Sequence, residues 1–180
     1  MRKFILILPL ALIVCLMVGC QDKAAMAELA EFKAKAALEE QNKALVMRYT
    51  EELNKKNLEI FNELCAPDYR YHYPSQDPNP LSRDDMIDMM KYFYQAFPDL
   101  IWRIEDVIAE GDKVSYRFIG RGTHEEEFRG VPATGNKIEV SGIFFTYIKN
   151  GKIVEDREEY DLLGKMMQLG TELKPKEEEK

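Results

Sequence analysis

The stretch GTHEEEFRGVPATGNKIEVSGIFFTYIKNGKIVEDREEYD, residues 122–161, contains the clearest structural signal in the chain. Its second half has two alternating runs of residues on either side of Asn150-Gly151. An Asn-Gly pair between two such runs is typical of a tight turn that joins antiparallel strands. We therefore expect strands at about 136–149 and 152–160 that pair as a hairpin.

The residues before and after this hairpin predict helices first and further strands later. Such an order is typical of an α+β fold, in which helices pack against a curled antiparallel sheet. A stripe of methionines and phenylalanines after Ser82, the expected cap of one helix, should belong to the core. The first packed helix should start at Ala44, a second should run over 57–64 with Asn57 as its cap, and two more should run over 82–97 and 162–169. The other expected strands run over 69–73, 100–110, 113–122 and 126–130.

Six short pieces of the chain follow one another in a suggestive order. They are Gly122-Thr123-His124, Phe128-x-Gly130, Thr134-Gly135, Gly142-Ile143, Gly151-Lys152-Ile153-Val154-Glu155 and Asp161-x-Leu163-Gly164. In order and spacing they resemble the SnoaL-like ester cyclases, which include polyketide cyclases and form a branch of the NTF2-like superfamily.

The resemblance covers residues 42–170 and implies an NTF2-like cone. In that fold, three N-terminal helices pack in the concavity of a curved antiparallel sheet. It also implies that a carboxylate at the end of the last strand, here Asp161, acts as a general acid/base without a cofactor. Members of this superfamily often pair through the outer sheet face, so a homodimer is expected as well.

The N-terminus has the features of an export signal. Arg2 and Lys3 precede an apolar run that ends at Val18, and Gly19-Cys20 follows. This run is shorter than the roughly 20 residues of a spanning helix. Its end resembles a bacterial lipobox, which predicts a signal peptide over 1–19 and lipidation at Cys20. The alternative is an uncleaved membrane anchor. Either way, we expect an exported, cell-envelope protein held at a membrane.

Two further segments lie outside the expected domain. Residues 20–41 are rich in Ala, Glu and Lys and should form a helical tether, whereas the charged tail 171–180 should be disordered. Removal of residues 1–19 takes away two basic residues and changes the net charge from -7 to -9. An acidic chain without a basic stripe argues against nucleic acid as a partner.

Asp161 has two interpretations that the sequence leaves open. A buried carboxylate at a pocket wall would have a raised pKa and could transfer a proton. An Asp before an apolar run is equally suited to cap the helix that starts at Leu162. Strand alternation places Asp161 on one face with Arg157, and the resemblance assigns that face to the pocket.

The other expected pocket residues are polar groups and aromatic walls. Tyr147 takes the place at which the polyketide cyclases have a His, and Arg157 either pairs with neighbouring acids or holds an anionic ligand. The two histidines lack metal-ligand spacing, so no metal is expected, and Cys65 should be a buried, inert thiol. The complete set of expected pocket residues is Tyr147, His124, His72, Arg117, Arg157, Phe145, Trp102 and Tyr94.

Two functions remain open at this level. One is a membrane-anchored SnoaL-like protein that binds a small, partly apolar molecule and catalyses a cyclase- or isomerase-type reaction through Asp161. The other is a non-catalytic module for ligand binding or assembly in the cell envelope. The missing His and the Arg at position 157 favour the second, because an ion pair would keep Asp161 charged.

Overall fold

The computed structural model describes residues 7–172, with side chains from residue 23 onward. The first six residues of the predicted signal peptide and most of the predicted tail lie outside the described residues, and Cys20 lies outside the described side chains. The contacts divide the chain into two units, residues 1–38 and 39–180.

Helix α1 (Ile7–Asn54) joins the predicted tether and the first packed helix without a break. The side chains of residues 23–38 are all exposed, whereas Val46 and Tyr49 are buried in the core of the second unit. Within the part of the chain that the structure describes, no helix is long and apolar enough to cross a membrane.

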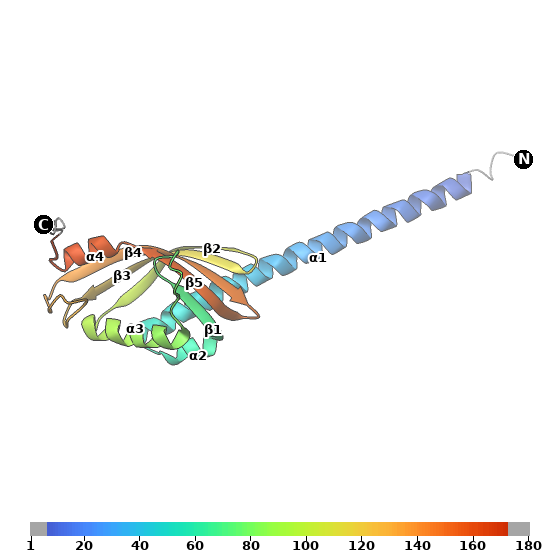
Figure 1. The fold of residues 1–180 in the computed structure, drawn as a ribbon. Helices are drawn as coiled ribbons and strands as arrows, with labels where there is room; N and C mark the ends of the chain where they lie inside the picture. Colours follow the sequence, from blue (N-terminus) through green and yellow to red (C-terminus); the bar gives the residue numbers. More distant parts are fainter. Residues whose placement is uncertain (1–6, 173–180) are drawn as a thin grey trace, which may run out of the picture. The chain divides into compact units, whose positions relative to one another are not determined.

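Five strands form one sheet in the order β1-β5-β4-β3-β2 (Figure 1). The predicted hairpin is confirmed, with Asn150 and Gly151 both at positive φ, as a tight turn between twisted strands requires. Among these five strands of the described residues, only β1 and β5 pair in parallel. The strands are β1 (Cys65–His72), β2 (Ile101–Glu110), β3 (Lys113–Thr123), β4 (Lys137–Lys149) and β5 (Lys152–Tyr160).

The helices α2 (Glu59–Leu64) and α3 (Arg83–Ala96) lie beneath the same face of the curved sheet, and α4 (Leu162–Gln168) lies beside β4 (Figure 1). This arrangement confirms the predicted α+β, NTF2-like architecture. Ser82 caps α3 through a complete capping box with Asp85, as expected. The methionines Met86 and Met90 of its apolar stripe are buried in the core.

Two predicted details are wrong. Asn57 does not cap α2, since its side chain donates to Glu52 and the cap position is Leu58. The strand expected at 126–130 is a single bridge between Phe128 and Val131. Arg129 and Gly130 both have positive φ, so the backbone turns back there and an extended strand cannot continue.

Candidate active site

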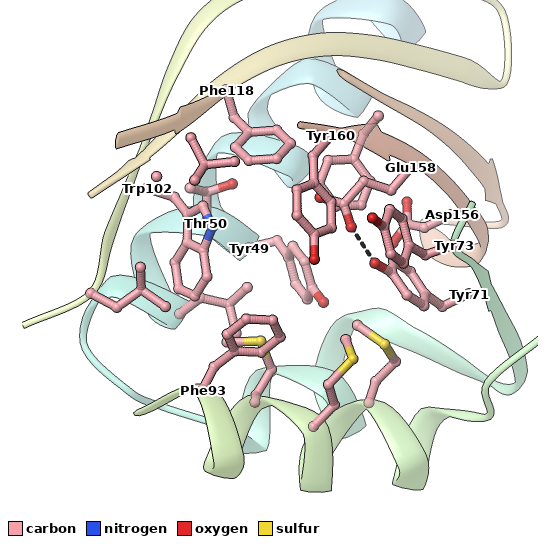
Figure 2. Close-up of a pocket in the computed structure, with 18 of the residues that line it drawn as sticks. Tyr49, Thr50, Tyr71, Tyr73, Phe93, Trp102, Phe118, Asp156, Glu158 and Tyr160 are labelled. Carbon is pink, nitrogen blue, oxygen red and sulfur yellow. Dashed lines mark hydrogen bonds between the residues drawn. The ribbon is translucent and has the colours of Figure 1, made fainter. Parts of the chain in front are cut away.

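A cavity of about 120 Å³ lies between the helices and the concave face of the sheet. A single water needs roughly a tenth of that volume, so the space suits a small organic molecule. Figure 2 shows the wall, which is mostly aromatic and thioether, with Tyr49 from α1, Phe93 from α3 and Phe118 from β3. Such a wall favours an apolar ligand body.

Two carboxylates of β5, Asp156 and Glu158, are buried in this wall. They are 2% and 8% exposed, and they share one face because strand side chains alternate. Tyr69 donates to Asp156 Oδ2 at 2.7 Å, and Thr146 donates to Asp156 Oδ1. Tyr71 donates to Glu158 Oε2, the bond drawn in Figure 2. Buried carboxylates need such donors.

Burial gives these two groups unusual acidities. Desolvation raises the pKa of Glu158 to about 8, with a further contribution from the negative charge of Asp156 and an opposing one from the Tyr71 hydrogen bond. Desolvation also raises the pKa of Asp156 to about 6, against the two hydrogen bonds that it accepts. At neutral pH, Glu158 is therefore mainly a neutral acid, and Asp156 is mainly charged.

Two cations also line the cavity. Arg129 is exposed, so the cavity opens to solvent beside it. Lys165 of α4 is only 4% exposed, and burial lowers its pKa to about 7. Within the described part of the chain, no group of three His, Cys, Asp or Glu side chains is placed to hold a metal ion.

Residues 43–169 match the model of a protein family described as SnoaL-like polyketide cyclase. The chain belongs to this family. No protein with a curated description matches the SnoaL-like chain.

Many solved structures share the fold of this SnoaL-like chain. The candidate polyketide cyclase IdmH from Streptomyces antibioticus is 30% identical, with a TM-score of 0.65 over 73% of this chain and 99% of its own. The candidate hydroxylase AclR from Streptomyces galilaeus is 28% identical, with a TM-score of 0.66 over 72% of this chain and 95% of its own. A candidate SnoaL-like polyketide cyclase from Jannaschia sp. CCS1 is 24% identical, with a TM-score of 0.67 over 76% of this chain and 96% of its own. At this identity the likeness shows the fold alone.

Asp161 lies outside the lining of the cavity in this SnoaL-like domain. It is exposed, and its Oδ1 accepts from the backbone N–H of Gly164 at 2.7 Å. The structure thus gives it the position of a cap for α4.

The cavity lies on the opposite sheet face from the one assigned by the resemblance. Tyr147 is half-buried under Lys113, and Phe145 is 52% exposed on the outer face. Arg157 pairs with Glu155 at 2.5 Å and donates to the carbonyl of Ser75. Pairing with a neighbouring acid is one of the two roles predicted for Arg157.

Three further predicted residues also lie outside the cavity lining. His72 Nδ1 is 2.7 Å from the carbonyl oxygen of Asp77. Arg117 is exposed and lies 3.7 Å from Glu105. His124 is fully buried, stacks on Phe97 and contacts Thr134 through Nδ1 at 3.0 Å.

Trp102 does line the cavity, as expected, with Tyr94 edge-on behind it. The hydroxyl of Tyr94 donates to the carbonyl of Leu53 at 2.6 Å and so joins α3 to α1. Of the predicted pocket residues, Trp102 is therefore the one that the structure places in the cavity wall.

The sequence interpretation missed Asp156, Glu158, Tyr71 and Lys165. One signal was present in the hairpin. Its register pairs Asp156 with Thr146 and Glu158 with Phe144, so these acids share a face with the apolar residues of β4. An acid opposite Phe144 loses its contact with water once helices cover that face, because the same helices exclude water from both.

Proposed function

We propose that the domain binds a small, partly apolar molecule in this cavity and transfers a proton on it with Glu158 as general acid/base. The observation that carries the proposal is the position of Glu158. It is a carboxyl group that is mainly neutral near pH 7, it is only 8% exposed, and it lines an aromatic cavity. A catalytic acid is most effective with a pKa near the working pH.

One carboxyl group is sufficient for a cofactor-independent isomerase- or cyclase-type reaction. Glu158 gives its proton to one atom of the bound molecule, such as a carbonyl oxygen, and the resulting carboxylate then takes a proton from another atom. No net proton is consumed. Tyr71 stabilises the carboxylate stage by its hydrogen bond, while the charge of Asp156 restores the protonated stage.

The proposal replaces Asp161 by Glu158 as the proton-transferring group. Glu158 meets the requirement that a catalytic group reach the ligand, since it lines the cavity and Asp161 does not. The alternative function, a binding or assembly module without chemistry, is favoured by the donors that already occupy both buried carboxylates.

The test is mass spectrometry of small molecules that co-purify with the full chain from its native host. Wild type is compared with Glu158→Gln and with Glu159→Gln, a neighbouring acid on the outer face that binds Ser75. We expect a chemically different molecule only in Glu158→Gln. The same molecule in all three samples would leave a binding module as the function. An Asp161→Asn sample tests the sequence prediction for that residue directly.

We further infer that the chain is exported and anchored through Cys20. The support is the basic start, the short apolar run and the Gly-Cys pair at its end. Cys20→Ser should move the protein from the membrane fraction to the soluble fraction and abolish incorporation of labelled fatty acid. Retention of Cys20→Ser in membranes would indicate an uncleaved anchor instead.

A homodimer through the outer sheet face is part of the same proposal. Ile108 and Phe145 are 71% and 52% exposed, and both pair with Ser115 of the strand between them. These two apolar side chains lie on either side of Ser115 in one row across three strands, which favours contact with a second copy of the sheet. Phe145→Glu should halve the mass in solution, measured by light scattering. An unchanged mass would rule out this face as the dimer contact.

A further inference from the structure

Lys165 has a position that the proton-transfer chemistry does not use. It extends from α4 into the cavity wall between three phenylalanine rings. Its Nζ lies 4.0 Å from the ring centroid of Phe128, 4.3 Å from that of Phe93 and 4.7 Å from that of Phe97. A buried lysine is rare in a soluble domain, and one that is aimed into a ligand cavity is a candidate for chemistry.

The charged groups around Lys165 come from two other parts of the domain. Glu158 of β5 raises its pKa and Arg129 of the loop after β3 lowers it, while no described carboxylate forms an ion pair with it. The three rings favour the ammonium form, and burial opposes it. Desolvation by burial is the main cause that lowers its pKa to about 7, and it exceeds the effects of Arg129 and Glu158. A large share of Lys165 is therefore a free amine at neutral pH.

We propose that Lys165 is a nucleophile that forms a Schiff base with an aldehyde or ketone held in the cavity. This rests on the ligand cavity of the proposed function and adds a covalent step to it. An unprotonated lysine amine in an apolar site attacks carbonyl carbon readily. The apolar wall suits an aldehyde or ketone with a hydrocarbon or aromatic body.

The step balances without any oxidant or reductant. The lone pair of Nζ forms a bond to the carbonyl carbon, the C=O π bond breaks, and one of the two protons on the nitrogen moves to the oxygen to give a carbinolamine. Glu158 then supplies a proton to that hydroxyl, which leaves as water. The nitrogen loses its remaining proton to the Glu158 carboxylate as the C=N bond forms. The products are one imine and one water.

Reductive trapping tests this step. The full chain is treated at pH 7 with benzaldehyde, present below the protein concentration, and sodium cyanoborohydride, and the benzylated residue is located by peptide mapping. Surface lysines have pKa values near 10.4, so Lys165 should present on the order of 10³ times more free amine at this pH. We expect one benzyl group, on Lys165. The trapping rate at Lys165 should rise with pH up to about 7 and then level off, whereas the rate at surface lysines should continue to rise above pH 7.

Lys165→Met should abolish the adduct, and Lys149→Met, which removes an exposed lysine at the end of β4, should retain it. Thermal melting of both variants shows whether the fold is intact. If Lys165→Met does not fold, the peptide map of wild type alone decides. Benzylation spread over surface lysines with Lys165 unmodified would overturn the proposal. Co-purification of a ligand altered by Glu158→Gln would, in that case, leave the proton-transfer function standing.

Discussion

The hydroxyl of Tyr71 donates a hydrogen bond to the carboxylate of Glu158, although 87 residues separate the two in the chain. The same separation relates Tyr69 to Asp156. Both pairs join β1 to β5, which run in parallel, with a regular register from Arg70 to His72 and a register shift between Cys65 and Arg70, where Tyr69 lies. The acidic wall of the cavity is thus a repeated phenol–carboxylate pair.

Tyr71→Phe should lower the free energy of unfolding by about 1–3 kcal/mol, because it removes the donor from a buried carboxyl group. Urea unfolding measures this. Tyr147→Phe is the matched control on the outer face, where the change should remain within about 0.5 kcal/mol. Equal losses in the two variants would mean that the Tyr71 hydrogen bond contributes no more than the half-buried phenol of Tyr147.

Glu158→Gln should change how stability depends on pH. The pKa of Glu158 is raised from 4.5 to about 8 on folding. Below about pH 4.5 both states are protonated, and between about pH 4.5 and 8 the unfolded state releases the proton first. Wild type therefore loses stability across this window, relative to Glu158→Gln. The difference in Tm against pH reports the titration of Glu158 together with its electrostatic coupling to Asp156 and Lys165. Parallel Tm curves would contradict the raised pKa.

Asp161→Ala should destabilise the domain by about 1 kcal/mol, since α4 loses its N-cap, whereas Asp161→Asn should have little effect because Asn is an equally good cap. Thermal or urea unfolding of the two variants provides the measurement. The pair also separates the two sequence interpretations. A large loss of ligand turnover in Asp161→Asn at unchanged stability would restore Asp161 as a catalytic residue.

Gly142→Ala should destabilise the domain by about 1–3 kcal/mol. A Cβ at this position would lie 2.6 Å from the ring of Phe118 and 2.7 Å from the carbonyl oxygen of Glu159, so both a cavity wall and a strand must shift. Ser141→Ala, one residue earlier and exposed, should be nearly neutral. A neutral Gly142→Ala would show that β4 and β5 adjust at little cost.

Much of the fold follows from local chemistry that a sequence displays. The Asn150-Gly151 turn, the Ser82 capping box and the Met86–Met90 stripe each depend on residues close together in the chain. The strand predicted at 126–130 is wrong because the sequence does not display the local feature that decides it. Backbone reversal at Arg129 and Gly130 is a conformational choice that the alternating pattern does not reveal.

The site was harder to predict from the sequence, because its position depends on which face of β4 the helices cover. Both faces are rich in apolar residues, so the pattern is equally compatible with a pocket on either side. The resemblance assigned the face of Tyr147 and Asp161 to the pocket, and Asp156 and Glu158 lie on the other face. Their burial depends on Tyr69 and Tyr71 of β1, and that parallel partner is not identifiable from the hairpin alone.

The parallel pairing of β1 with β5 also sets an order of events during folding. Every other neighbouring pair in the sheet is consecutive in the chain, whereas these two strands enclose the remaining three. A ribosome delivers β1 early and β5 nearly last, and long loops close more slowly than short ones. The hydroxyls of Tyr69 and Tyr71 therefore cannot bond to Asp156 and Glu158 until almost the whole domain has been synthesised. A nascent chain that stops short of β5 lacks Asp156 and Glu158, and therefore lacks the acidic part of the cavity wall.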